Sequence, residues 1–247
     1  MKISNTVALV TGANRGIGLG FTRELLARGA RKVYAGARDP STITQPGVEA
    51  IRLDVTKPEE IRAAAANAGD VMLLINNAGI AYQGGFLAQD SEEVARRQLE
   101  TNFFGMLRMS KAFAPILAAN GGGALLNVLS VASWMSGGGL SAYAASKSAA
   151  WSLTNSLRYE LASQNTQVLA LHMGFVDTDL TRGIDAPKAS ADEIVKRALD
   201  ALESDLDEVL ADERTKQVKL GLTAARPSYL PQGGSEPSSS QLQRRPA

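Results

Sequence analysis

The stretch of residues 7–29 limits the possible folds of this chain more than any other. An apolar, β-rich run at 7–10 leads into the loop Thr-Gly-Ala-Asn-Arg-Gly-Ile-Gly at 11–18, and a helical pattern then continues to Arg28, where Gly29 is a natural C-cap. A strand, a glycine loop and a helix N-terminus in this order can bind a pyrophosphate through backbone N–H groups. The spacing Gly-x-x-x-Gly-x-Gly differs from the commoner Gly-x-Gly-x-x-Gly, so an ordinary strand-to-helix turn is the alternative interpretation.

Strand and helix patterns alternate along the rest of the chain. Further strands are predicted at 32–37, 48–55, 71–75, 124–129, 168–171 and 208–210. Helices are predicted at about 56–68, 91–119, 142–163, 190–202 and 213–225, with capping boxes at Thr56-x-x-Glu59 and Ser190-x-x-Glu193. This alternation predicts an α/β fold, a Rossmann-type doubly wound parallel sheet of about seven strands with helices on both faces.

Composition limits the organisation and the partners of the chain. With 247 residues, 45% of them hydrophobic, the chain fits a single domain at 1–225. The remaining stretch, 226–247, is rich in Pro, Ser, Gly and Gln and is predicted to be a disordered tail. The formal net charge of +1 favours neither nucleic acid nor an acidic membrane as a partner.

Several chemistries and locations are disfavoured on residue counts. The chain has no Cys, which removes disulfides and thiolate chemistry, and no metal-ligand spacing surrounds its only histidine, His172, so no metal site is expected. His172 is interpreted as a structural residue. No apolar run approaches the roughly 20 residues that span a bilayer, and the N-terminus lacks a signal-peptide pattern. A cytoplasmic location is therefore expected.

The end of the second predicted strand indicates which nicotinamide cofactor would be preferred. An acid at this position holds the ribose 2′-OH of NAD, whereas an arginine accommodates the 2′-phosphate of NADP. The sequence there is Ala37-Arg38-Asp39, and Arg15 in the glycine loop adds a second cation. Two cations against one acid favour NADP(H), with NAD(H) as the other candidate.

Other polar residues stand near predicted strand ends. Asp54 could accept a hydrogen bond from an adenine amino group, or it could simply be solvated in a loop. In Asn-Asn-Ala-Gly at 76–79, the Asn side chains could fix the loop to neighbouring strands, while Ala and Gly let a flat ring lie against the backbone. Asn102 falls inside a helical pattern, where Asn has poor propensity; it marks either a local distortion or a polar residue on the outer face.

Three residues between 130 and 147 suit the interconversion of a carbonyl and an alcohol. Tyr143 and Lys147 are four apart and therefore share a helix face. A neighbouring ammonium is expected to lower the pKa of the phenol from its ordinary value of about 10. Ser130 stands at a strand end, where its hydroxyl could hold an oxygen atom. The alternative is that Tyr143 and Lys147 belong to a solvated helix face.

Taken in order, these motifs resemble the short-chain dehydrogenase/reductase family over about residues 5–225. The resemblance implies a catalytic tetrad of Asn102, Ser130, Tyr143 and Lys147. Tyr143 would be the general acid or base, Lys147 would bind the nicotinamide ribose and lower the pKa of Tyr143, and Ser130 would hold the substrate oxygen. Asn102 would hold a water that links Lys147 to solvent, and Thr178 would bind the nicotinamide carboxamide.

The same resemblance implies a set of cofactor-binding residues. Besides Tyr143 and Lys147 they are Gly12, Asn14, Arg15, Gly16, Ile17, Gly18, Arg38, Asp54, Val55, Asn76, Ala78, Gly79, Gly174, Val176 and Thr178. Two departures from the family pattern matter. Met173-Gly174 replaces the usual Pro-Gly, which is expected to loosen the loop under the nicotinamide. Only about ten residues separate Thr178 from the predicted cap at Ser190, which predicts a short lid and an open pocket.

The substrate pocket is expected to draw on residues 80–86, 131–140 and 175–185. Ser130, Trp134 and Tyr143 are the predicted substrate contacts, and the apolar Trp134, Met135, Leu140 and Phe175 favour an apolar ketone, aldehyde or secondary alcohol, unless they belong to the core. The predicted function is hydride transfer between NADP(H) and such a small molecule. A silent NADP(H)-binding sensor or scaffold, or an epimerase or dehydratase, is the alternative. The resemblance also implies a homodimer or homotetramer paired through the helices at 91–119 and 142–163.

Overall fold

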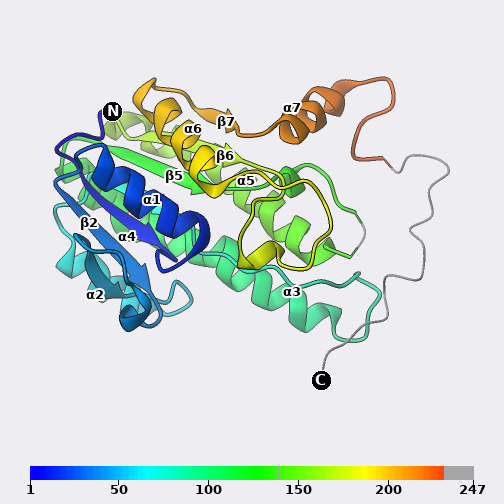
Figure 1. The fold of residues 1–247 in the computed structure, drawn as a ribbon, viewed down its shortest axis with the longest axis horizontal. Helices are drawn as coiled ribbons and strands as arrows, with labels where there is room; N and C mark the ends of the chain where they lie inside the picture. Colours follow the sequence, from blue (N-terminus) through cyan, green and yellow to red (C-terminus); the bar gives the residue numbers. More distant parts are fainter. Residues whose placement is uncertain (138, 231–247) are drawn as a thin grey trace.

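Seven parallel strands form the centre of the molecule (Figure 1), seen in a computed structural model that describes residues 1–137 and 139–230. Their order across the sheet is β3-β2-β1-β4-β5-β6-β7, and each neighbouring pair is parallel. The strands are β1 Val7–Thr11, β2 Lys32–Ala37, β3 Glu49–Arg52, β4 Leu73–Asn76, β5 Ala124–Val128, β6 Gln167–His172 and β7 Glu208–Leu210. The strand order reverses between β1 and β4, which places a crevice at their carboxyl ends.

Helices cover both faces of the sheet, as predicted. They are α1 Gly16–Ala27, α2 Pro58–Asn67, α3 Ser91–Leu99, α4 Met106–Ala119, α5 Ser141–Leu161, α6 Ala191–Glu203 and α7 Glu213–Leu220. Side chains of α1 and α6, such as Phe21 and Leu199, pack in one core, whereas those of α2, α4 and α5, such as Phe113 and Leu157, pack in the other. Figure 1 shows α1 and α6 in front of the sheet.

Strand β1 shows why the central strands are mainly apolar. Its residues alternate between the two cores: Ala8 and Val10 belong to the core under α1 and α6, and Val7 and Leu9 to the core under α2, α4 and α5. Because successive side chains point to opposite faces, both faces of β1 must be hydrophobic. The fold class predicted from the alternating pattern is confirmed.

The long helix predicted at 91–119 is interrupted. A π-helical segment, Glu100–Gly105, separates α3 from α4, and Asn102 lies within it with only 1% of its surface exposed. The interpretation of Asn102 as the site of a helix distortion is therefore confirmed, and the outer-face alternative is wrong. At Gly105 an added Cβ would stand 2.7 Å from the Val55 Cγ2 atom, so the segment passes close to the end of β3.

Both predicted capping boxes are wrong. Helix α2 begins at Pro58, with Lys57 at its N-cap and no side-chain cap. The Thr56 N–H and hydroxyl instead bond the Asp54 carboxylate, at 2.9 and 2.7 Å. Ser190 is the N-cap residue of α6 but makes no side-chain cap bond either.

Strand β3 and helix α7 are considerably shorter than predicted. Strand β3 covers four residues of the predicted 48–55, and α7 ends at Leu220, followed by a 3₁₀ turn at Gly221–Thr223. Most of the predicted tail, 231–247, lies outside the described residues, and the domain boundary stays a prediction. Within residues 1–137 and 139–230, no helix combines the length and the apolarity needed to cross a bilayer.

Candidate active site

The glycine loop turns tightly at the carboxyl end of β1. Gly12 and Gly16 adopt φ values of +65° and +54°, a region that favours glycine. A Cβ at Gly18 would stand 2.1 Å from the Gly12 carbonyl oxygen, so the first turn of α1 lies directly on the loop. Helix α1 has no side-chain cap and no acid in its first turn. Its first N–H groups are therefore free of side-chain acceptors, as an anion site at a helix N-terminus requires.

The loop after β4 is fixed to the end of β1. The Asn77 Nδ2 group donates to the carbonyl oxygens of Thr11 and Gly12, at 2.8 and 3.2 Å. The Thr11 hydroxyl oxygen accepts from the N–H groups of Asn77 and Ala78, both at 2.9 Å. These bonds hold Ala78 and Gly79 on the wall of the crevice. Asn77 therefore fixes the loop to a neighbouring strand, as predicted for the asparagines of this motif.

Asn76 lies elsewhere than the cofactor-binding prediction expects. Its side chain is buried and donates to Asn127 Oδ1 and Ser110 Oγ, at 2.9 and 3.2 Å. It does not line the crevice. We therefore leave Asn76 out of the cofactor contacts proposed below and assign it to the connection between β4, β5 and α4.

Charged residues at the ends of β2 and β3 mark the far end of the crevice. Arg38 is exposed there and forms no ion pair with any residue that the structure describes. One oxygen of the Asp39 carboxylate accepts from the Ser41 hydroxyl and N–H, and these bonds hold the pKa of Asp39 below its usual range. Arg15 lies 3.4 Å from Asp179, in an exposed pair. Arg38 is thus the cation left for a ligand at this end.

Ser130 follows β5 and begins a short 3₁₀ turn. Its hydroxyl oxygen accepts from the Ala132 N–H at 3.1 Å, and the residue lies on the crevice wall, 7% exposed. Directly beneath it, Nδ1 of His172 lies 3.2 Å from the Ser130 carbonyl oxygen. His172 is fully buried and stacks on Trp134, with ring centroids 4.0 Å apart. Its structural interpretation fits these contacts.

Tyr143 and Lys147 both face the crevice from the first turns of α5. The Lys147 ammonium donates to the Val128 carbonyl oxygen at 2.9 Å and lies 5.9 Å from the centroid of the Tyr143 ring. The expected lowering of the pKa of Tyr143 by Lys147 is wrong for this structure. Burial raises the pKa of the phenol, and its hydrogen bond with Ser130 opposes that rise. Burial also lowers the pKa of Lys147 to about 8.

The Asn102 side chain is fully engaged in hydrogen bonds. Its Oδ1 accepts from the Ile80 N–H, and its Nδ2 donates to the Ile80 carbonyl and to the Ser146 hydroxyl, each at 2.9 Å. The π-helical segment is thereby joined to the loop after β4 and to α5.

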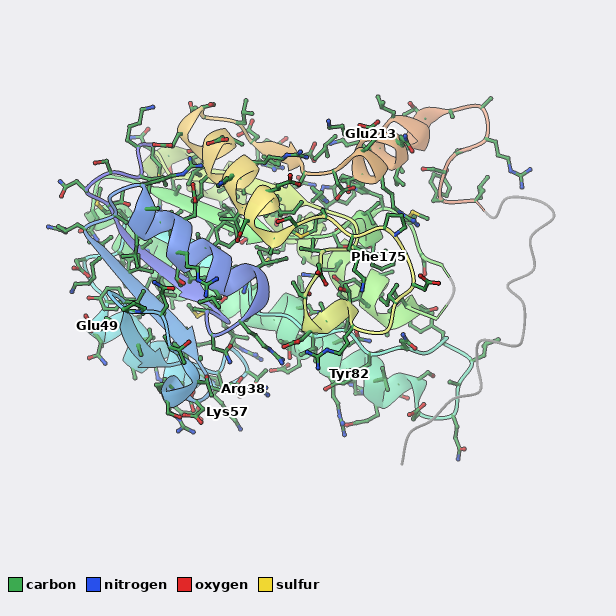
Figure 2. The ribbon with its side chains drawn as sticks, viewed as in Figure 1. Arg38, Glu49, Lys57, Tyr82, Phe175 and Glu213 are labelled. Carbon is green, nitrogen blue, oxygen red and sulfur yellow. The ribbon has the colours of Figure 1, made fainter. Side chains whose placement is uncertain are left out.

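One continuous pocket of about 1420 Å³ joins these groups. It extends from Arg38, past the glycine loop, to Ser130, Tyr143 and Lys147. Figure 2 labels Arg38 at the end of β2 and shows Tyr82 and Phe175 farther along, beside α3 and the loop after β6. The substrate end is lined by Ile80, Ala81, Tyr82, Val131, Met135, Leu140, Phe175, Leu180, Ile184 and Arg214.

Trp134 does not belong to the pocket wall. Its ring packs against His172 and, edge to face, against Trp151, at 6.2 Å between centroids. Trp134 is therefore a core residue, which was the alternative to the predicted substrate contact. We leave it out of the proposed substrate contacts. Residues 177–188 form the segment over the pocket, closed by a bridge between Val176 and Ala189.

Several residues on or behind the pocket were not foreseen from the sequence. The role of Thr11 could have been inferred from the sequence, because a hydroxyl at a strand end can accept hydrogen bonds from the N–H groups of a neighbouring loop. No sequence pattern indicates Arg214, because it belongs to α7, far along the chain. Its guanidinium lies 5.7 Å from the centroid of the Phe175 ring. Ser146 is hidden in the same way, because only the tertiary fold brings it to Asn102.

The fold and the pocket together define a nucleotide-binding protein of the doubly wound α/β class. The family model for the short chain dehydrogenase matches residues 6–189. A 3-oxoacyl-[acyl-carrier-protein] reductase of Vibrio cholerae is 34% identical over 200 residues, which are 77% of this chain and 82% of that protein. The corresponding reductase of Escherichia coli is 33% identical over 193 residues, 74% and 79% of the two chains.

A solved structure is also similar over nearly the whole length. A short chain dehydrogenase from Burkholderia cenocepacia, in complex with NADP, is 40% identical, with a TM-score of 0.88 over 91% of this chain and 95% of that one. The chain belongs to the short-chain dehydrogenase/reductase family of oxidoreductases.

Proposed function

We propose that this protein transfers a hydride between NADP(H) and a carbonyl or secondary alcohol. The observation that carries the proposal is that Ser130, Tyr143 and Lys147 line the same pocket as the glycine loop and Arg38. A hydroxyl pair able to hold and protonate an oxygen therefore lies in one crevice with an anion-binding helix terminus.

The residues present fit a dinucleotide. The small residues Gly12, Gly16, Ala78 and Gly79 line the pocket beside the N-terminus of α1, whose first turn carries neither a side-chain cap nor an acid. We propose that the cofactor contacts are Gly12, Asn14, Arg15, Gly16, Ile17, Arg38, Asp54, Val55, Ala78, Gly79, Tyr143, Lys147, Gly174, Val176 and Thr178, which line the pocket, with Gly18 shaping the loop beneath. When bound, the reduced nicotinamide supplies the hydride.

The protein's own groups manage the substrate oxygen and its proton. The Ser130 hydroxyl holds the carbonyl oxygen. The Tyr143 hydroxyl donates its proton to that oxygen during reduction, and the Tyr143 phenolate removes the proton from the alcohol in the reverse direction. With a pKa of about 8, Lys147 is mostly protonated at neutral pH, and its ammonium is assigned to the hydroxyls of the nicotinamide ribose. We also assign to Asn102 the role of holding a water that connects Lys147 to solvent.

NADP(H) is preferred in this proposal because Arg38 lacks an acidic partner among the described residues while the Asp39 carboxylate closes its own turn. The similar Burkholderia structure holds NADP. The test is to titrate NADPH and NADH into the wild type and into Arg38→Ala. We expect tighter binding of NADPH, lost in the variant. Arg31→Ala, an exposed arginine just before β2 at the opposite edge of the sheet, is the matched control.

If NADH binds as well as NADPH in the wild type, Asp39 sets the preference and the NADP proposal is wrong. If neither binds, the glycine loop has been misinterpreted. The sensor or scaffold alternative is separated by turnover, and an epimerase or dehydratase by a product formed without net consumption of cofactor.

For the substrate we propose an uncharged ketone, aldehyde or secondary alcohol, held by the apolar side chains Ile80, Met135, Leu140, Phe175 and Leu180. Because the similar Vibrio and Escherichia proteins are 3-oxoacyl-[acyl-carrier-protein] reductases by name, a 3-oxoacyl compound belongs in the first panel of substrates. NADPH oxidation is the readout.

We also propose that two copies pair through α3, α4 and α5. Tyr159 on α5 is 87% exposed and Phe104, just before α4, is 41% exposed, so both long helices present large apolar side chains to solvent.

A further inference from the structure

The loop that follows β6 lacks the rigid residue expected at its start. Met173 stands there: its side chain packs in the core under α1 and α6, and its carbonyl oxygen accepts from the Val131 N–H at 2.8 Å. Gly174, Val176 and Thr178 follow on the pocket wall, where the proposed nicotinamide end would lie. A loop with this task needs another restraint, because proline fixes φ and methionine does not.

Asp212 supplies a restraint from outside the pocket. Its Oδ2 atom accepts from the Gly174 N–H at 2.6 Å, a short bond to an ionised group. Its Oδ1 atom accepts from the Thr215 N–H and hydroxyl, at 2.8 and 2.9 Å, and so caps α7. The carboxylate lies against Gly174 so closely that an added Cβ there would stand 3.3 Å from Oδ1.

The other end of α7 is fixed beneath Ser130. Lys219 pairs with Glu208, whose other carboxylate oxygen lies 3.6 Å from Nε2 of His172. The opposite ring nitrogen of His172 lies 3.2 Å from the Ser130 carbonyl. Helix α7 is therefore held at both ends against the two segments that carry Ser130 and Gly174, which makes Asp212 a fixed anchor.

We propose that Asp212 is a positioning residue for the nicotinamide end of the cofactor. It does not line the pocket itself, so it acts through the Gly174 backbone, and it replaces the restraint that Met173 lacks. The inference rests on the proposed function, because it assumes that a nicotinamide lies on the loop after β6.

The test separates the two ends of the cofactor. The variant Asp212→Ser retains a good N-cap residue for α7, but its single, shorter oxygen cannot also reach Gly174. We expect about tenfold weaker binding of NADPH, as befits the loss of one charge-assisted hydrogen bond. The affinity for 2′,5′-ADP, which carries only the end bound near Arg38, should stay unchanged. For the best substrate, kcat should fall more than the KM of the carbonyl rises.

Thr215→Val is the matched control, because it removes one bond to Oδ1 and leaves the Gly174 bond in place. It should bind NADPH like the wild type. If Asp212→Ser does not fold, as judged by its thermal transition, Asp212→Thr keeps an N-cap oxygen on a different side chain and is measured in the same way.

The inference is wrong if Asp212→Ser leaves NADPH binding unchanged, or if it weakens NADPH and 2′,5′-ADP equally, which would indicate a general structural role. A wild type that binds neither ligand contradicts the proposed function instead. The two failures are therefore distinguishable by titration of the wild type.

Discussion

Tyr143 and Lys147 show what a spacing can and cannot predict. A separation of four residues places two side chains on one helix face, and both do face the pocket. The direction of the Lys147 ammonium could not be predicted, because its acceptor, the Val128 carbonyl, belongs to a strand end that only the fold brings near. Local sequence thus predicts which groups meet, while burial decides their pKa values.

The variant Tyr143→Phe removes the proposed proton donor and little else. Turnover should fall by about 10²–10⁴-fold, the range typical of a general acid or base, while NADPH binding stays near the wild-type value. Tyr159→Phe, an exposed tyrosine on the same helix, is the control and should keep full activity. Steady-state rates and a binding titration check both. Full activity in Tyr143→Phe would remove Tyr143 from the mechanism.

His172 should make stability depend on pH. Burial lowers its folded-state pKa to about 3 from 6.5, so between these values the unfolded chain binds the extra proton. Stability is therefore full above about pH 6.5 and is lost as the pH falls, by about 1.4 kcal/mol for each pH unit. Urea unfolding at pH 7.0 and 5.5 should show this loss in the wild type but not in His172→Gln. Because His172 is the only histidine, equal losses in both proteins would contradict the assignment.

For the helices and strands, the kind of element was easier to predict than its first and last residues. Strands β2 and β7 begin and end where the β-rich runs do, because turn residues or charges flank them. Helix α2 begins after Lys57 rather than at Thr56, because Asp54 takes the Thr56 N–H and hydroxyl into its own turn. Pro58 carries the signal for this start, because proline favours the first helical position and disfavours a helical residue before it.

The close contact between the glycine loop and α1 can be tested at Gly18. In Gly18→Ala the new Cβ would lie 2.1 Å from a backbone carbonyl, which cannot move aside like a flexible side chain. We expect a loss of stability of at least about 1–3 kcal/mol, together with loss of NADPH binding. Gly69→Ala, with no atom within 4 Å of the added Cβ, should behave like the wild type in the same denaturation and binding measurements. Normal binding by Gly18→Ala would show that the loop adapts.

At the scale of the whole molecule, the sequence supports the sheet more firmly than the site. Alternation of strands and helices predicts a parallel sheet with covered faces, and the polar residues after its strands must then meet at one edge. The sequence does not predict which polar and aromatic side chains near the site point into the core. Asn76, Asn127 and Thr154 form a buried chain of bonds at 2.9 and 3.0 Å, and Trp134 turns into the core, because tertiary packing decides these directions.

The oligomer is tested on the same scale. Tyr159→Glu places a charge on the exposed face of α5 and should shift the protein toward the monomer, because a buried unpaired charge is costly at an interface. Sedimentation velocity or light scattering gives the mass. Lys216→Glu, an exposed substitution on α7, should leave the mass unchanged. A wild type that is monomeric at all concentrations would exclude the pairing.

The π-helical segment has a geometric consequence for the residues before it. An α-helix turns by about 100° at each residue, so one residue more or less between α3 and α4 rotates one helix about its axis relative to the other. In α3 only Gln98 is buried, and it accepts from the Tyr82 N–H at 3.0 Å, whereas α4 buries Met109 and Phe113 in the core. Deleting a single residue between them would turn Gln98 away from Tyr82 and open that wall of the pocket. The number of residues in the π-helical segment therefore determines which side chains of α3 face the pocket.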